Sequence, residues 1–143
     1  VVPYNCIFIY EVVGAYFSPT NNPLFNRIFF LLFGLLGLIL LIKTPMGWYP
    51  YTAVTSSLLF TFALVLLSPN WLSQFVVTYL ICLIPFLVVN GLLTGAATEN
   101  PVVWYNEQEF SGWRMITIPV EDLFYNFYYY LALFCFSNFN VNV

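Results

Sequence analysis

The 143-residue sequence contains no histidine, few cysteines and very few charged residues. Without histidine, most catalytic triads and most metal sites are hard to build. Cys6, Cys82 and Cys135 lie in separate apolar stretches without CxxC spacing, so neither a zinc site nor a disulfide framework is indicated. We therefore expect no metal and no other cofactor, and we interpret the cysteines as small buried hydrophobic residues.

Charged residues make up 6% of the sequence, whereas soluble domains contain roughly 25%. Hydrophobic residues make up 62%, and residues 44–98 include no Asp, Glu, Lys or Arg. An uncharged run of this length accommodates two membrane spans of about 20 residues each. The net charge of −3 comes from only nine charged residues, so it says nothing about nucleic acid, and no nucleic-acid partner is predicted. The composition predicts an integral membrane protein in contact with lipid.

Continuous apolar runs indicate that the membrane spans are helices. Residues 31–42 show no alternation of apolar and polar side chains, which the strands of a membrane β-barrel would require. Turn-forming residues divide the sequence into predicted helices at residues 3–17, 24–42, 49–67, 71–96 and 119–137. Gly34 and Gly37 are expected to allow close helix packing, and Pro85 to kink the fourth helix. The predicted fold is an all-α membrane bundle with about four full transmembrane helices and one partial helix at the start.

Most of the acidic residues lie within residues 99–122, and the segment TIPVED at residues 117–122 opens the last apolar helix. Pro119 suits the first helical turn, where its missing N–H is not needed. Glu121 and Asp122 would lie in the same turn, where the helix dipole favours anions. Ordinary helix capping explains this pattern by itself. Carboxyl groups at a membrane boundary are nevertheless candidates for function.

The two acids are expected to lie at the head of an aromatic helix face, because residues three and four positions apart share a face. Glu121 would lie above Tyr125 and Tyr128, and Asp122 above Tyr129. These rings could bind a substrate, or they could anchor the helix at the membrane interface.

Other polar residues have two interpretations each. Glu11 is either an acid within the membrane or an interfacial residue. Asn90 and Thr94, one helical turn apart, either hydrogen-bond to a neighbouring helix or contact a substrate. Arg114 either forms a salt bridge within the polar loop or orients an acid such as Glu99.

Several motifs in one order resemble the lycopene cyclase domain family. They are NGLLTG at residues 90–95, PVVWYN at residues 101–106, Arg114, and TIPVEDLFY at residues 117–125. The strong part of the resemblance covers about residues 90–130, and the preceding helices agree only in pattern. The resemblance implies a membrane-embedded carotenoid β-cyclase that forms β-ionone rings at the ends of lycopene.

The implied reaction starts when a carboxylic acid protonates the terminal alkene of lycopene. The neighbouring double bond attacks the resulting tertiary cation, and a base then removes a proton, so the net change is an isomerisation. A carboxyl group stays protonated where apolar burial and a like-charged neighbour act on it, whereas the helix dipole favours the anion. Aromatic faces stabilise a cation without trapping it as an alcohol.

The predicted site has three groups of residues. Glu121 and Asp122 are the catalytic acid and base, in an order that the sequence leaves open. The predicted substrate-binding residues are Tyr125, Tyr128, Tyr129, Trp104, Asn90 and Thr94. The predicted supporting residues are Arg114, Glu99, Tyr105, Pro119 and Glu11.

The family is built from two related membrane repeats, fused in one chain or present as two subunits, and each has a Pro-x-acid-acid motif. Residues 1–22 look like the tail of a preceding repeat, residues 23–137 like one lycopene-cyclase-like domain, and residues 138–143 like a polar tail. We interpret the start at Val1 as internal, because it lacks the basic region of a signal peptide. A first repeat or a partner cyclase subunit is therefore expected to be needed for activity, and the bacterial cytoplasmic membrane is the expected location.

Two other functions remain open at this point. In a noncatalytic membrane scaffold or partner subunit, the acids would only cap a helix. In a proton-coupled transporter fragment, Glu11, Asn90 and the acidic pair would form a path. The interrupted helix expected of transporters occurs only once in the sequence, at Pro85.

Overall fold

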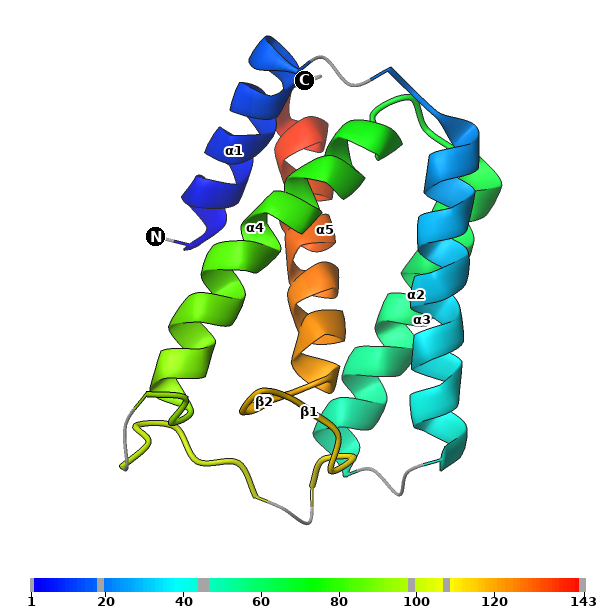
Figure 1. The fold of residues 1–143 in the computed structure, drawn as a ribbon. Helices are drawn as coiled ribbons and strands as arrows, with labels where there is room; N and C mark the ends of the chain where they lie inside the picture. The colour runs from blue at the N-terminus through cyan, green and yellow to red at the C-terminus, as the bar shows by residue number, and fades with distance from the viewer. Residues whose placement is uncertain (1, 18–19, 44–46, 98–99, 107–108, 142–143) are drawn as a thin grey trace.

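A computed structural model describes residues 2–17, 20–43, 47–97, 100–106 and 109–141. Within these residues the chain forms a bundle of helices and one short hairpin (Figure 1), which confirms the all-α prediction. The helices are α1 (Val2–Tyr16), α2 (Pro23–Lys43), α3 (Trp48–Leu67), α4 (Leu72–Leu93) and α5 (Glu121–Val141). The hairpin pairs β1 (Arg114–Met115) with β2 (Ile118–Pro119) in antiparallel register.

Among the described residues, three helical segments are long and apolar enough to cross a membrane, namely Pro23–Ile42, Pro50–Leu67 and Leu72–Leu93. Large apolar side chains cover their outer surfaces, and Leu31 and Leu59 are each 71% exposed. Such a surface is unfavourable in water and favourable in lipid. The chain is therefore a membrane protein, whereas the exact number of spans, with α5 as a fourth, stays a prediction.

Helix α4 ends at Leu93, so the prediction that it reaches residue 96 is wrong. Gly95 has φ = +97°, a left-handed conformation in which an α-helix does not continue. The Ala96 N–H instead donates a hydrogen bond to the Gly91 carbonyl oxygen (2.8 Å). This turn directs the chain toward the loop that leads to the hairpin.

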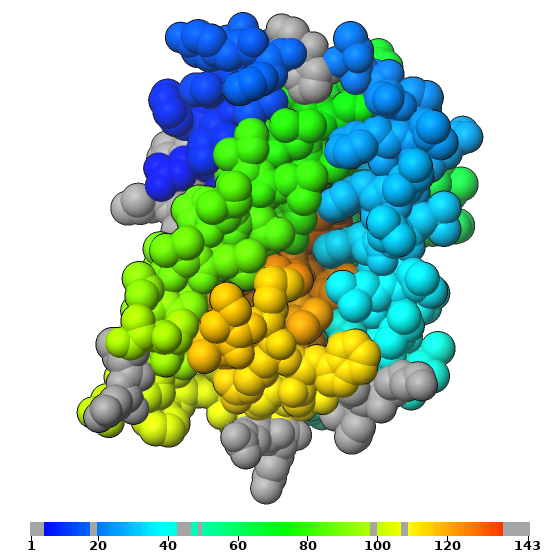
Figure 2. All heavy atoms as spheres, viewed as in Figure 1, coloured from blue at the N-terminus to red at the C-terminus, as the bar shows by residue number. Residues whose placement is uncertain are grey.

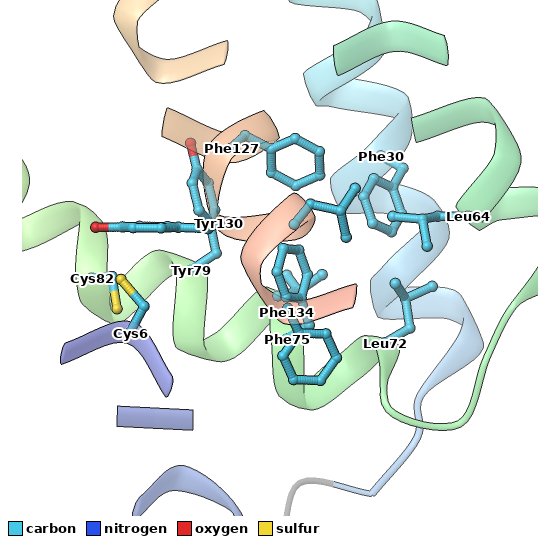
Figure 3. Packing of buried hydrophobic residues seen from close by; sticks show 12 residues of the cluster. Cys6, Phe30, Leu64, Leu72, Phe75, Tyr79, Cys82, Phe127, Tyr130 and Phe134 are labelled. Carbon is cyan, nitrogen blue, oxygen red and sulfur yellow. The ribbon is translucent and has the colours of Figure 1, made fainter. Parts of the chain in front are cut away.

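The core is largely aromatic, and α5 runs through the middle of the bundle (Figures 1 and 3). Phe127 of α5 is fully buried, and its ring centroid lies 5.2 Å from Tyr79, 5.7 Å from Phe75 and 6.2 Å from Phe30. Aromatic pairs at these separations add stability beyond the burial of their area. Because the three partners come from α2 and α4, this cluster holds α5 against both helices.

Gly37 lets α2 approach α3 and α5 closely. A Cβ atom on Gly37 would lie 3.0 Å from Leu58 Cδ2 and 3.0 Å from Phe124 Cε1, whereas at Gly34 the nearest atom is 4.0 Å away. The expected close-packing role is therefore confirmed for Gly37, while Gly34 has more room. The first turn of α5, which carries the acidic pair, is thus packed directly against α2.

Candidate active site

Glu121 and Asp122 are the first two residues of α5, and both side chains are buried, with exposed fractions of 1% and 7%. Carboxyl groups are rarely buried to this degree unless they have partners or a function. The segment of residues 109–120, coloured yellow and orange in Figure 2, covers this end of the bundle between α4 and α2. The acids are therefore shielded from bulk solvent rather than directed into it.

Two neighbouring helices fix the first turn of α5. The Tyr79 hydroxyl, from α4, donates a hydrogen bond to the Leu123 carbonyl oxygen (3.0 Å). The Ser57 hydroxyl, from α3, lies 2.7 Å from the Phe124 carbonyl oxygen and can donate to it. Since both carbonyl groups belong to the turn that begins with the acids, these contacts determine where the carboxyl groups lie.

Both acids line a cavity of about 180 Å³. Its other walls come from the start of α3, from the loop after α4 and from the hairpin; they are Pro50, Trp104, Tyr105, Asn106, Glu109, Phe110 and Pro119. The aromatic rings of this cavity thus belong to the loop, and the rings of Tyr105 and Phe110 meet edge to face at 6.3 Å. The cavity combines three acidic residues, Glu109, Glu121 and Asp122, with aromatic side chains that could stabilise a cation.

The carboxyl groups of Glu121 and Asp122 have different hydrogen-bond partners. Asp122 Oδ2 accepts a hydrogen bond from the Tyr105 hydroxyl (2.5 Å). Glu121 Oε1 accepts one from the Ser111 N–H (2.5 Å), while Glu121 Oε2 is buried and has no hydrogen-bond partner among the described residues. Burial, followed by the hydrogen bond to Asp122, raises the pKa of Tyr105, so this phenol remains a donor at neutral pH.

Pro119 does not lie in the first turn of α5, so that prediction is wrong. Ile116 has φ = +61°, which turns the chain back so that Pro119 pairs with Arg114 in the hairpin. A residue in an extended strand pair cannot also belong to a helical turn. Pro119 instead forms part of the cavity wall, next to the helix start.

Arg114 supports the wall of the acid cavity. Its guanidinium donates to the Thr117 carbonyl oxygen (2.9 Å) and lies over the Phe110 ring, with Cζ 4.5 Å from the centroid. Glu99, its predicted partner, lies outside the described residues.

A second cavity, of about 430 Å³, lies between α1, α4 and α5. Asn90, Tyr125 and Tyr129 all line it, and the two tyrosine rings stack at 6.3 Å with an angle of 13° between their planes. The Asn126 Nδ2 atom is buried and has no partner in the described residues, and Asn126 also lines this cavity. The predicted aromatic face of α5 is therefore present, but these tyrosines line a different cavity from the acids.

Three other predicted residues, Tyr128, Thr94 and Glu11, do not line either of these two cavities. Tyr128 packs against the Phe60 ring at 5.4 Å, and the Thr94 hydroxyl lies 2.6 Å from the Thr117 hydroxyl. Glu11 is exposed on α1. Trp104, in contrast, lines the acid cavity although it is 78% exposed. Within the described residues, no group of three or more His, Cys, Asp and Glu side chains could hold a metal ion.

Sequence reasoning missed several residues of this site. Ser111 donates its backbone N–H to Glu121, and the other missed residues line the acid cavity: Pro50, Asn106, Glu109 and Phe110. Phe110 could have been identified as a candidate, because an aromatic side chain within a polar loop is unusual unless it packs against another part of the protein. No sequence signal identifies a backbone N–H as a partner of a distant carboxyl group, because every residue other than proline carries one.

A family model described as lycopene cyclase matches residues 48–140. No curated protein and no solved structure matches the chain. The matched segment runs from α3 through α4 and the hairpin to nearly the end of α5, so it includes both acids and every residue that lines their cavity. Because the match covers well over half of the sequence, the chain belongs to the lycopene cyclase family.

Proposed function

We propose that this chain supplies the acid and the base of a lycopene β-cyclase, which converts the linear ends of lycopene into β-ionone rings without net oxidation or reduction. The observation that carries the proposal is the burial of Glu121 and Asp122 side by side in a cavity with aromatic walls. Membership of the family supports carotenoid cyclisation as the class of reaction.

The chemistry requires a carboxylic acid that can protonate an alkene in a place from which water is excluded. Water would capture the tertiary cation as an alcohol, so the shielding of the two acids supports ring closure over hydration. The Trp104 and Tyr105 rings line the same cavity and could stabilise positive charge there, whereas the Arg114 guanidinium already lies over the Phe110 ring. The adjacent carboxyl group then accepts the proton that is lost when the ring double bond forms.

The acid cavity is smaller than the roughly 300–1,000 Å³ of usual ligand sites, so we assign to it only the reacting end of the substrate. The larger cavity has the size and the aromatic lining expected of a site for part of an apolar chain. We assign this cavity to the polyene, with Asn90, Tyr125 and Tyr129 as contacts.

We further propose that the chain works as one half of a cyclase, with α5 as a fourth span. A preceding repeat or a separate subunit would supply the other half, and residues 1–22 would be the tail of that repeat. Lipid would surround the exposed apolar surfaces of α2 and α3. The bacterial cytoplasmic membrane is the proposed location.

The test is the production of β-carotene or γ-carotene in a lycopene-making bacterial host that expresses this chain together with the other half of the cyclase. We expect the double variant Glu121→Gln, Asp122→Asn to accumulate lycopene while the complex still assembles. The control is Glu11→Gln, which removes an exposed acid outside both cavities. Unchanged cyclisation per assembled complex in the double variant would exclude the proposed chemistry and would favour a noncatalytic scaffold.

A further inference from the structure

The structure distinguishes the two carboxyl groups. We infer that Glu121 donates the proton that starts cyclisation, that Asp122 accepts the proton that ends it, and that Tyr105 positions Asp122 for this role. The inference rests on the proposed function and goes further by giving each acid one step. Its basis is the difference between the partners of the two side chains.

Glu121 has the surroundings of a neutral acid. Its side chain is 1% exposed, and Oε1 accepts the Ser111 N–H, as a carbonyl oxygen would. Oε2 is buried without a hydrogen-bond partner among the residues described, in a side chain that lines the cavity. A buried anionic oxygen without a donor is much more costly than a buried neutral one. Oε2 is therefore the atom that would carry the proton, and a substrate alkene in the cavity would be its acceptor.

Asp122 has the surroundings of an anion. Its Oδ2 accepts the Tyr105 hydroxyl hydrogen, and such charge-assisted hydrogen bonds favour the ionised carboxylate. Tyr105 is held at this place by the loop, where its ring meets the Phe110 ring.

Only one proton is expected on the adjacent acids, because two like charges in one buried cavity repel each other. The helix dipole does not decide which acid is protonated, since both residues lie in the first turn of α5. The difference in hydrogen bonding therefore determines which of the two acids is protonated. It places the proton on Glu121 and the negative charge on Asp122.

The two roles give a balanced reaction. The O–H bond of Glu121 breaks as a C–H bond forms at the terminal alkene, which leaves a tertiary cation on the neighbouring carbon. The next double bond supplies its electron pair to form the ring C–C bond, and the charge moves to a ring carbon. Asp122 then takes a proton from the adjacent ring carbon, and the electrons of that C–H bond form the ring double bond. Transfer of the proton from Asp122 back to Glu121 restores the starting state.

The test compares the single variants Glu121→Gln and Asp122→Asn in the assembled cyclase with lycopene in D₂O buffer. Without the donor, we expect unreacted lycopene and no deuterium in any carotenoid. Without the acceptor, protonation and ring closure still occur, so deuterium is incorporated. The cation then loses a different proton or is captured by water, which gives rings with a displaced double bond or a hydroxyl group.

Tyr105→Phe tests the positioning role, because it removes the hydroxyl and keeps the ring. We expect roughly a tenfold fall in turnover, as for loss of a hydrogen bond to a charged group, and a shift of products in the same direction as Asp122→Asn. The matched control is Tyr16→Phe, at a side chain that is 82% exposed on α1. The product ratio is informative because a purely structural defect would reduce yield without changing it.

Each result separates the inference from the proposal on which it rests. If Glu121→Gln gives rings with a displaced double bond or a hydroxyl group and Asp122→Asn gives only unreacted lycopene, the assignment of roles is overturned and the cyclase proposal stays intact. Lycopene as the sole carotenoid from an assembled Asp122→Asn complex overturns the assignment of Asp122 as acceptor. A normal product ratio and turnover in Tyr105→Phe overturns its positioning role. Normal turnover of both acid variants refutes the proposed function itself.

Discussion

Replacing Gly47 by alanine is expected to lift the loop away from the acid cavity. Gly47 is the N-cap of α3, and its N–H donates to the Glu109 carbonyl oxygen (3.0 Å). A Cβ atom on Gly47 would lie 2.8 Å from the same oxygen, closer than real Cβ contacts allow. The backbone angles of Gly47 (φ = −65°, ψ = 176°) are open to alanine, so the effect arises from lack of space alone.

The magnitude depends on whether the loop moves. If the loop stays in place, overpacking should cost about 1–3 kcal/mol of stability. If it moves, the cost falls to about 1 kcal/mol for the lost hydrogen bond, but the wall formed by Glu109 and Phe110 leaves the cavity. We expect the second outcome, because few contacts hold a surface loop compared with a helix core.

The assay combines carotenoid analysis in the co-expressing host with the thermal midpoint of the purified complex in detergent. Gly47→Ala should lower cyclisation strongly and the midpoint only slightly. Gly34→Ala is the matched control, since its nearest neighbour is 4.0 Å away and alanine favours a helix by up to about 1 kcal/mol. Full cyclisation and an unchanged midpoint in Gly47→Ala would show that the loop does not rest on α3.

Two further substitutions test the packing that positions α5. Gly37→Ala places a methyl group 3.0 Å from the Phe124 ring, so its thermal midpoint should fall below that of Gly34→Ala, by an amount equivalent to about 1–2 kcal/mol; equal midpoints would contradict close packing there. Tyr79→Phe removes the hydrogen bond to the Leu123 carbonyl oxygen and should cost about 1 kcal/mol, with lower turnover per complex. A Tyr79→Phe complex with unchanged stability and turnover would mean that this bond does not anchor the acids.

The helices were predictable because their information is local. Continuous apolar runs and the turn formers between them placed α2 and α3 within about two residues of their observed ends. The position of Glu121 and Asp122 in the first turn of α5 was predictable from the TIPVED motif, but their burial was not, because acids at a membrane boundary can also face water. The end of α4 was missed because the φ angle of Gly95 depends on where the following loop has to go.

The hydrogen-bond partners of the two acids were not predictable, because they depend on how the loop after α4 folds back onto the start of α5. Tyr105 lies 17 positions before Asp122, and Ser111 lies 10 positions before Glu121. Helical periodicity relates residues only three or four positions apart, so it pointed to the tyrosines of α5 instead. The hairpin that brings the loop back requires a left-handed φ at Ile116, and a β-branched residue gives no indication of such a turn.

The origin of the two parts of the site explains how one fold can give two adjacent acids different hydrogen-bond partners. Tyr79 and Ser57 attach the first turn of α5 to α4 and α3, so the positions of the carboxyl groups are set by the rigid bundle. Their identified hydrogen-bond donors, Tyr105 and Ser111, both come from the loop. Two carboxyl groups on one helical turn experience nearly the same dipole and a similar depth of burial. A difference between them must therefore come from outside the helix, and the loop supplies it.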